Sequence, residues 1–343
     1  MKVLVVDDSP LMRSIIHNIL HAAGHHTEVA ENGAVALEMV KKVDPDVLTM
    51  DVEMPVMGGL ECLERLMATD PRPVVMLSTL TAEGAETALT ALELGAVDVM
   101  GKPRRSDGGL RNAQDRILAK VEAAATAQVR RRGVEHAAEV EPDSATLPSG
   151  PRLVVIGAST GGPPVVSDLL TCLPADYPLP IVVALHMPEG FTGRFVARMA
   201  RKSRGLRIVE VTDSMPIEPG TAYLAPGGRD LEVTESTGRL VAHPRPIDEG
   251  SIWHPGVGRL VTSAMEVIDP QQIVSVMLTG MGDDGAAAMA ELRRRGGLTV
   301  AESRDSAVIF GMPGALVEAS GASLVLHRDQ IRAHLKSLAQ RVC

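Results

Sequence analysis

Short aliphatic runs alternate with longer amphipathic stretches through most of the chain. In the first part of the chain the runs are Val3–Val6, Val47–Met50, Val74–Leu77 and Val97–Met100. Buried parallel strands read as continuous apolar runs, and the helices that connect them cover both faces of the sheet. The alternation therefore predicts an α/β fold with a parallel sheet. Ser9-Pro10 predicts the start of a helix, whose expected apolar face consists of Leu11, Ile15, Ile16 and Ile19.

The alternation stops between about residue 123 and residue 150. In this stretch Arg130-Arg131-Arg132 precedes polar, acidic sequence that contains Pro142 and Pro148, and no apolar periodicity survives. Such a segment is typical of a linker between domains. The expected divisions are a first domain at 1–122, a linker at 123–150 and a second domain at 151–343. A docking patch is the alternative interpretation of the basic triplet.

The second domain resumes the alternation and adds a region of different character. Residues 205–245 are richer in glycine and proline and carry short alternating segments at Thr221–Leu224 and Asp230–Val233. We interpret these segments as hairpin-like strands inserted in an otherwise α/β domain. An amphipathic helix is expected to close the chain, with an apolar face that consists of Ile331, Leu335, Leu338 and Val342.

Acidic residues follow the strands predicted in the first domain. Asp7-Asp8 and Asp51 come directly after two of these strands, and Ser78 and Lys102 follow two others. The carboxyl ends of parallel strands meet at one edge of a sheet, so these side chains can converge. Carboxylates this close repel one another unless a cation neutralises them, and oxygen ligands suit Mg²⁺. The set suits phosphoryl transfer to an aspartate. The alternative is that Asp7 and Asp8 only cap the following helix.

Several segments of the first domain form a specific pattern. They are Asp7-Asp8-Ser9, Asp51–Gly59, Ser78 and Lys102-Pro103. With these segments the domain resembles the response-regulator receiver domain over its full length, which implies a flavodoxin-like doubly wound sheet and phosphorylation of Asp51 by a chemotaxis histidine kinase. The resemblance also implies Mg²⁺ bound by Asp7, Asp8, Asp51 and the carbonyl of Glu53, a switch hydroxyl on Ser78 and a phosphate-contacting Lys102. Val99 stands where such domains usually have an aromatic residue.

Three aliphatic runs of the second domain end in the residue types of a serine-hydrolase triad. The runs Leu153–Ile156, Ile181–Leu185 and Ile273–Leu278 lead to Ser159, to His186 and to the acidic pair Asp283-Asp284, respectively. Ligands of open parallel sheets bind beyond the carboxyl ends of the strands, so we expect these residues at one sheet edge. A serine hydroxyl is inert without a base, and the base needs a carboxylate to fix its tautomer. Either aspartate satisfies that need.

The turn around Ser159 fits two templates. Gly157-Ala158-Ser159-Thr160-Gly161 matches Gly-x-Ser-x-Gly, in which small residues expose the hydroxyl. A glycine-rich turn can also bind phosphate, although Ser159 occupies the place of the second glycine of the dinucleotide-binding motif. The order Ser…His…Asp differs from that of the α/β-hydrolases. Gly280 and Gly282 leave backbone N–H groups near Met281 for an oxyanion.

The composition narrows the function classes. The 343 residues carry a net charge of −9, which argues against a nucleic-acid partner, and only 2% are aromatic, so the cores are expected to be aliphatic and methionine-rich. Cys62, Cys172 and Cys343 show no metal-site spacing and are expected to be reduced thiols of a cytoplasmic protein. The N-terminal apolar run is too short for a signal peptide, and no segment is long enough to span a bilayer.

Several segments of the second domain also form a specific pattern. They are Ile156–Gly162, His186–Pro188, Gly190–Thr192, Tyr223–Gly227, Leu278–Ala286 and Phe310–Pro313. With them the domain closely resembles the catalytic domain of the chemotaxis protein-glutamate methylesterases, the CheB family. The resemblance implies a doubly wound parallel-sheet serine-hydrolase domain with a β-hairpin insertion and no cofactor of its own. It implies that Ser159 is the nucleophile, that His186 is the base and is oriented by Asp284, and that Met281 contributes the oxyanion donor.

The resemblance further implies hydrolysis of glutamate methyl esters on methylated chemoreceptors, deamidation of receptor glutamines, and activation by phosphorylation during chemotactic adaptation. Two departures stand in this domain: Gly258 replaces an aspartate within the segment 253–259, and Glu302 replaces a glutamine. We expect both changes to leave the triad itself alone. Two rival interpretations remain, a catalytically silent protein that titrates a kinase or receptor, and a phospho-regulated esterase with a different substrate.

Overall fold

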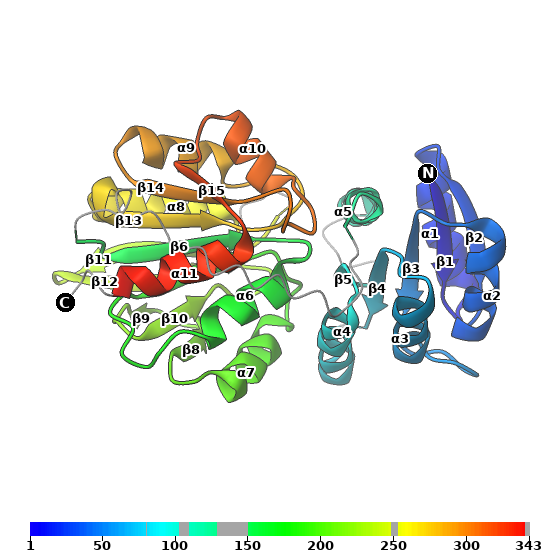
Figure 1. The fold of residues 1–343 in the computed structure, drawn as a ribbon. Helices are drawn as coiled ribbons and strands as arrows, with labels where there is room; N and C mark the ends of the chain where they lie inside the picture. The colour runs from blue at the N-terminus through cyan, green and yellow to red at the C-terminus, as the bar shows by residue number, and fades with distance from the viewer. Residues whose placement is uncertain (80, 103–109, 129–149, 248–252, 340–343) are drawn as a thin grey trace. The chain divides into compact units, whose positions relative to one another are not determined.

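The computed structural model describes the chain except for residues 80, 103–109, 129–149, 248–252 and 340–343. The chain divides into two compact units, Met1–Glu135 and His136–Cys343 (Figure 1). Some residues discussed above lie outside the described ones, namely Pro103, Arg130–Arg132, Pro142, Pro148, Val342 and Cys343, together with most of the expected linker. None of the described helices combines the length and apolar character that crossing a bilayer requires.

The first unit is a five-stranded parallel sheet covered by helices. Its strands are β1 (Lys2–Val6), β2 (His26–Ala30), β3 (Val47–Asp51), β4 (Val74–Ser78) and β5 (Asp98–Gly101). Its helices are α1 (Pro10–Ala22), α2 (Gly33–Val43), α3 (Gly59–Thr69), α4 (Ala82–Leu94) and α5 (Leu110–Ala125). The strands pair in the order β2-β1-β3-β4-β5. This order is that of the flavodoxin-like doubly wound folds, and it confirms the fold expected for this half of the chain.

Helix α1 begins where the sequence predicts. The Ser9 hydroxyl accepts a hydrogen bond from the Met12 N–H at 3.4 Å, and Pro10 occupies the first turn. The prediction that Leu11 belongs to the apolar face is wrong, because its side chain is 69% exposed. At about 100° per residue, Leu11 lies about 140° around the helix from the fully buried Ile16.

The second unit is built on a seven-stranded parallel sheet with the order β15-β14-β13-β6-β7-β10-β8. Its strands are β6 (Leu153–Ala158), β7 (Ile181–Leu185), β8 (Arg207–Glu210), β10 (Thr221–Leu224), β13 (Ile273–Met277), β14 (Leu298–Glu302) and β15 (Leu324–Leu326). Its helices are α6 (Gly162–Thr171), α7 (Thr192–Lys202), α8 (Val257–Val267), α9 (Ala286–Arg294), α10 (Met312–Glu318) and α11 (Arg328–Ala339), with a short 3₁₀ turn at Pro270–Gln272. Helices α8 and α9 cover one face, and α6, α7 and α11 cover the other (Figure 1). The expected doubly wound sheet is confirmed.

A small antiparallel sheet is formed by segments that lie before and after β10 in the chain. It consists of β9 (Met215–Pro216), β11 (Asp230–Ser236) and β12 (Arg239–Arg245), and β11 and β12 form the expected hairpin. The assignment of Thr221–Leu224 to this insertion is wrong. These four residues are buried and form β10, which pairs in parallel with β7 and β8 of the main sheet. A run this short does not show from its pattern whether one or both of its faces are covered.

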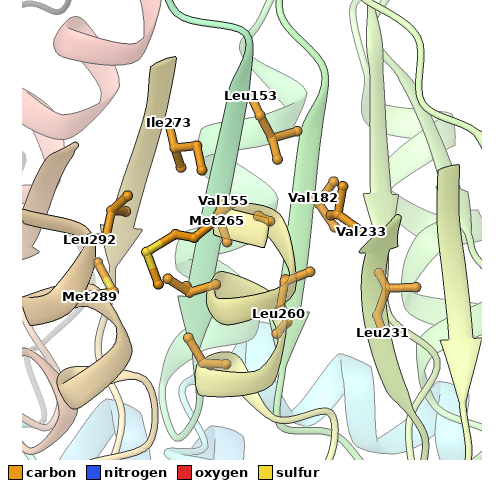
Figure 2. Close-up of a cluster of buried hydrophobic side chains, with 14 of the residues drawn as sticks. Leu153, Val155, Val182, Leu231, Val233, Leu260, Met265, Ile273, Met289 and Leu292 are labelled. Carbon is orange, nitrogen blue, oxygen red and sulfur yellow. The ribbon is translucent and has the colours of Figure 1, made fainter. Parts of the chain in front are cut away.

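A buried cluster joins the main sheet, helix α8 and the hairpin (Figure 2). Val155 and Val182 come from the sheet, Leu260 from α8 and Leu231 from β11, and all four side chains are fully buried. Burying each such side chain contributes roughly 1.5–3 kcal/mol. This packing fixes the position of α8, and therefore the position of the chain segment directly before it, near the carboxyl ends of the central strands.

Candidate active site

Three adjacent strands of the second unit carry the predicted triad. Strand β6 lies between β13 and β7 in the sheet. Ser159 follows the last residue of β6, His186 follows the last residue of β7, and Asp284 lies in the loop that connects β13 to α9. Every residue of these three strands is buried, which explains why their sequences are continuous apolar runs. The three side chains therefore reach the same sheet edge, as the sequence predicts.

The turn that presents Ser159 depends on small residues. The Ser159 N–H donates to the Thr279 carbonyl at 3.0 Å, and the Gly162 N–H donates to the Ser159 carbonyl at 2.7 Å. Gly161 has a φ of 76°, a conformation that favours glycine. A Cβ on Gly162 would lie 2.9 Å from the Ala158 Cβ, so the start of α6 packs directly against the end of β6. The chain thus turns sharply at Ser159.

The triad side chains are connected by hydrogen bonds. Nδ1 of His186 lies 3.0 Å from the Ser159 Oγ, and Nε2 of His186 lies 2.8 Å from Oδ2 of Asp284. Because an ionised carboxylate can only accept, the pairing is consistent with a proton on Nε2, which leaves Nδ1 to accept from the serine hydroxyl. Ser159 is 1% exposed and His186 is 6% exposed. This is the geometry in which a base can deprotonate a serine.

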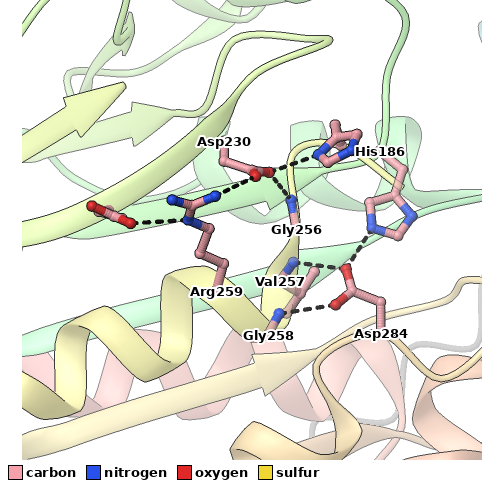
Figure 3. A network of polar contacts seen from close by, with 9 residues as sticks. His186, Asp230, Gly256, Val257, Gly258, Arg259 and Asp284 are labelled. Atoms are coloured by element: carbon pink, nitrogen blue, oxygen red, sulfur yellow. Dashed lines mark hydrogen bonds and ion pairs between the residues drawn. The ribbon is translucent and has the colours of Figure 1, made fainter. Parts of the chain in front are cut away.

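Asp284 is held by backbone donors as well as by the imidazole (Figure 3). The Val257 N–H donates to Oδ2 at 2.7 Å, and the Gly258 N–H donates to Oδ1 at 3.0 Å. Burial raises the pKa of the Asp284 carboxyl, but the hydrogen bond and charge of His186, with the two backbone donors, outweigh it, so the pKa is lowered overall. Asp284 is therefore ionised at neutral pH and stabilises a protonated His186.

The expectation that the changes in segment 253–259 leave the triad alone stays a prediction, although the backbone of this segment contacts the triad acid. Val257 and Gly258 of this segment hold the triad carboxylate, as described above. A Cβ on Gly258 would lie 3.3 Å from the Asp284 Oδ1, a tighter contact than most real Cβ atoms make. A side chain at position 258 would therefore crowd the triad acid.

The loop after β13, which contains Met281, comes close to Ser159. A Cβ on Gly280 would lie 2.9 Å from the Ser159 Cβ, and the Gly280 N–H donates to the Ile309 carbonyl at 3.1 Å. Gly282, on the other side of Met281, has a φ of 76°. Met281 is 9% exposed. The role of its N–H as an oxyanion donor stays a prediction, and the close approach of Gly280 to Ser159 supports it.

Glu302 is a supporting residue that the sequence marked only as a departure from the family pattern. It is fully buried, and its Oε2 accepts from the Thr279 N–H at 2.8 Å while its Oε1 accepts from the Ser306 hydroxyl at 2.9 Å. Burial raises the pKa of the Glu302 carboxyl. The Thr279 hydroxyl in turn donates to the Thr160 carbonyl at 3.0 Å. Glu302 thus fixes the start of the Met281 loop against the Ser159 turn.

The first unit brings together the predicted acid cluster. Asp7, Asp8 and Asp51 have carboxylate oxygens within 4.8 Å of one another. The Lys102 Nζ lies 2.7 Å from Oδ2 of Asp51 and 3.0 Å from Oδ2 of Asp7. The alternative in which Asp7 and Asp8 only cap a helix is wrong, because the N-cap of α1 is Ser9. Ser78 is buried at the end of β4, and its carbonyl accepts from the Lys102 N–H at 2.9 Å.

The charges of this cluster fit a divalent cation. Burial raises the pKa of the Asp51 carboxyl, and Lys102 lowers it only in part while Asp7 raises it further. The contact of Asp7 Oδ2 with Lys102 lacks hydrogen-bond geometry, and this buried oxygen has no hydrogen-bond partner within the described part of the chain. Oxygen donors in excess of the nearby positive charge are the ligand set that Mg²⁺ prefers. The switch role of Ser78 and the carbonyl ligand of Glu53 stay predictions.

Comparisons with known proteins agree with both sites. The family model described as CheB methylesterase matches residues 154–335, more than half of the chain, and the model of the response regulator receiver domain matches residues 3–113. The chain belongs to the CheB methylesterase family. This result confirms the resemblance inferred from the motifs.

Relatives within the CheB methylesterase family align over nearly the whole chain. Protein-glutamate methylesterase/protein-glutamine glutaminase 3 of Rhodospirillum rubrum is 46% identical over 99% of this chain and 96% of its own length. The enzyme of the same name from Vibrio cholerae is 42% identical over 93% of this chain and 91% of its own length. The crystal structure of the CheB methylesterase catalytic domain of Thermotoga maritima is 34% identical, with a TM-score of 0.52, and its alignment spans 55% of this chain and 99% of that chain.

Three residues near the site escaped the sequence interpretation in this member of the CheB family. Trp253 stacks on His186, Asp230 binds the segment that contacts Asp284, and Arg259 joins that network. The altered segment 253–259 was the only signal in the sequence for two of them. Asp230 gave no signal, because its partners lie more than twenty residues away along the chain.

Proposed function

We propose that this chain is a phosphorylation-activated protein-glutamate methylesterase that also deamidates protein glutamine. The observation that carries the proposal is the hydrogen-bonded series Ser159–His186–Asp284 at the carboxyl edge of the second sheet. A methyl ester and a primary amide of the same side chain react through similar tetrahedral intermediates, so one site serves both. The proposed substrates are the glutamate methyl esters and glutamines of methylated chemoreceptors, and the reaction would serve chemotactic adaptation.

The arrangement of the triad defines the chemical steps. The Ser159 Oγ attacks the ester carbonyl carbon while its proton moves to Nδ1 of His186. The intermediate collapses when the bond to the methoxy oxygen breaks, and His186 returns the proton to it, so methanol leaves. Water then attacks the acyl carbon and gives a proton to His186, which passes it to the departing Ser159 Oγ. The products are a glutamate carboxylate and free enzyme. With a glutamine substrate the same steps release ammonia.

Two further groups stabilise charge during these steps. Asp284 stays ionised and offsets the positive charge of protonated His186, because its pKa is lowered by the donors that surround it. We assign the Met281 N–H as donor to the oxyanion of the intermediate, supported by the contact of Gly280 with Ser159. Removing one such donor typically costs about 10²–10³ in rate.

The first unit is proposed to control the second. Asp51 would accept a phosphoryl group from a chemotaxis histidine kinase, with Lys102 contacting the phosphate and Ser78 acting as the switch hydroxyl. Asp7, Asp8, Asp51 and the carbonyl of Glu53 would hold Mg²⁺, which when bound offsets the charge of the incoming phosphate. The proposed functional divisions are a receiver at 1–122, a linker at 123–150 and a catalytic domain at 151–343, in a cytoplasmic protein.

Methanol release from methylated receptor tests the proposal directly. Wild type, Ser159→Ala and Asp51→Asn are compared with and without a small-molecule phospho-donor and Mg²⁺. We expect stimulated release from wild type, no release from Ser159→Ala, and release without stimulation from Asp51→Asn. Even a tenfold stimulation corresponds to only about 1.4 kcal/mol.

The other outcomes separate the rival functions. No methanol from wild type, together with labelling of Ser159 by a serine-reactive probe, would indicate an esterase for a different substrate. No methanol and no labelling would indicate a catalytically silent interaction protein. Full stimulation of Asp51→Asn would contradict the regulatory role of the first unit.

A further inference from the structure

The base of the triad is covered on one ring face by a tryptophan. The Trp253 indole stacks on the His186 imidazole with ring centroids 5.6 Å apart and ring planes 6° apart. Nε1 of Trp253 also lies 3.9 Å from the point where a Cβ on Gly282 would stand. The indole therefore borders both the base and the loop that holds Met281. Neither the hydrogen bonds of the triad nor the steps described above use this contact.

We propose that Trp253 is a positioning residue of the esterase reaction, which aligns His186 and stabilises it in its protonated form. The activity part of this proposal rests on the proposed function. An aromatic face attracts a cation whose centre lies within about 6 Å, and the attraction is absent for a neutral ring. During the reaction His186 becomes a cation when it takes the proton of Ser159. The contact is therefore stronger in the transition state than in the ground state, which is the condition for raising a rate.

The stack also restricts how the imidazole turns. Rotation about the bond between Cβ and the ring would break the parallel contact with Trp253 and the two hydrogen bonds, to Ser159 and Asp284, at the same time. Among the described residues, the hydrogen-bond and ring contacts of the imidazole are with the Ser159 hydroxyl, the Asp284 carboxylate and the indole. Only Asp284 among them carries a charge, so the indole supplies the stabilisation on the ring face.

Trp253 is the first residue of a segment that is fastened to a buried carboxylate. Asp230 is 1% exposed, and its Oδ1 lies 3.0 Å from Nδ1 of His254 and accepts from the Gly256 N–H at 2.8 Å. Its Oδ2 accepts from the Arg259 guanidinium at 3.1 Å (Figure 3). Three contacts on one carboxylate leave this segment little freedom to move.

The same segment therefore supports both members of the base–acid pair. Trp253 contacts the ring of His186, and the N–H groups of Val257 and Gly258 hold Asp284. Asp230 is the anchor that both contacts share. Both contacts therefore act on one hydrogen bond, that between His186 and Asp284. The Trp253 side chain acts at the histidine end, and the N–H groups of residues 257 and 258 act at the aspartate end.

Steady-state kinetics of full-length variants test the role of Trp253. Trp253→Ala is expected to lower kcat about two- to fivefold with KM little changed. A loss of this size corresponds to the free energy of one cation–π contact. The acid limb of the pH profile of kcat/KM should move to lower pH by about half a unit, because protonated His186 loses its partner. Trp253→Phe keeps an aromatic face and should restore most of both effects.

A matched control separates positioning from general damage. Glu232 accepts from Arg245 and Arg259 in the same network, and neither hydrogen bond involves the triad or Trp253. Glu232→Gln should leave kcat and the acid limb unchanged. A loss of kcat in Trp253→Ala without movement of the acid limb, or without rescue by Trp253→Phe, would overturn the proposal.

A readout without substrate keeps this proposal distinct from the proposed function. Trp253 is the only tryptophan of the chain, so its emission reports on this contact alone. A protonated imidazole quenches a stacked indole, and we expect emission of the full-length protein to fall on acidification. His186→Gln should abolish that change and His254→Gln should keep it.

The outcomes are then distinguishable. If wild type releases no methanol but its emission change depends on His186, the proposed function fails and the stacking role stands. If wild type releases methanol but the emission change survives in His186→Gln, the stacking role fails and the proposed function stands.

Discussion

The two units place functional side chains at the same part of a doubly wound sheet but balance charge in opposite ways. In the first unit, the carboxylates of Asp7, Asp8 and Asp51 lie within 4.8 Å of one another, and Lys102 forms ion pairs with two of them, Asp7 and Asp51. In the second unit, both oxygens of Asp284 accept hydrogen bonds from donors of the same unit. The first site fits the cation and phosphoryl group proposed above, and in the second site the carboxylate is already held by donors of its own unit.

The comparison shows that the fold fixes where a site lies and not what it does. The carboxyl ends of parallel strands supply a location in both units. The sites differ in whether neighbouring segments supply hydrogen-bond donors for every carboxylate oxygen, and this difference separates their proposed functions. The first two predictions below test that difference between the units, and the other two test buried titratable groups of the second unit.

The largest loss of activity is expected when Asp284 keeps only one oxygen that can accept from the donors around it. In Asp284→Asn, one amide oxygen faces His186 Nε2–H and the N–H groups of Val257 and Gly258, so the imidazole loses its fixed tautomer. We expect kcat for methyl-ester hydrolysis to fall about 10⁴-fold. The neighbouring exposed Asp283→Asn is the control and should retain activity. A loss of less than tenfold in Asp284→Asn would contradict the role of this acid.

Removal of divalent cations should affect only the first unit. A chelator is expected to return the phospho-donor-stimulated rate of methanol release to the basal rate, because the excess carboxylates no longer have a cation to balance an incoming phosphate. The basal rate should not change, since the triad uses donors of its own unit. Equal inhibition of the basal rate would show that the second unit also depends on a metal, and would break the comparison.

A buried histidine should link the stability of the second unit to pH. His334 is 1% exposed, and burial lowers its pKa from 6.5 to about 4. The folded state keeps the ring neutral while the unfolded state binds a proton below pH 6.5, so stability falls as pH falls through this interval, by about 1 kcal/mol per pH unit. Urea unfolding followed by Trp253 emission should show this slope.

His334→Leu should remove most of the slope, because leucine has a similar volume and no proton to bind. His21→Gln, on an exposed position of the first unit, is the control and should keep the slope. If His334→Leu and wild type lose stability in parallel between pH 6.5 and pH 5, another group is responsible.

The smallest effect is expected at Glu302. Burial raises its pKa, so the folded state holds a proton that the unfolded state releases, and stability falls as pH rises from 4.5 through the raised value. Glu302→Gln removes that loss and keeps an acceptor for the Thr279 N–H. We expect the variant to be more stable than wild type at pH 8 by about 1 kcal/mol, with the difference shrinking toward pH 4.5. Thermal unfolding at the two pH values measures it, and equal stability throughout would exclude a buried charge.

The strands and the residues at their ends were predictable from the sequence. Buried parallel strands require apolar side chains on both faces, so β6, β7 and β13 appear as continuous aliphatic runs, and the polar residue after each run stands out. Ser159, His186 and the pair Asp283-Asp284 were found in this way, and the acids of the first unit likewise; the family resemblance then selected Asp284. The N-cap of α1 was also predictable, because capping by Ser9 involves only residues within one helical turn.

Contacts between distant segments were not predictable. Thr221–Leu224 was assigned to the hairpin because its short pattern does not reveal that β7 and β8 flank it. Leu11 was placed on a buried face because apolar character does not say which side of a helix the sheet covers. The contact of segment 253–259 with Asp284 could not be foreseen, because it is made by backbone N–H groups, which are the same in every amino acid but proline.

The sequence by itself determined the alternation of most strands and helices along the chain, the residue types at the strand ends, and the family to which the chain belongs. These features depend on local apolar patterning and on short motifs. Only the tertiary structure decided that Trp253 lies on His186, that Asp230 anchors the segment around it, and that Glu302 supports the Met281 loop. Such contacts join residues far apart in the chain, and their geometry is set by how the sheet, α8 and the hairpin pack together, which no local pattern records.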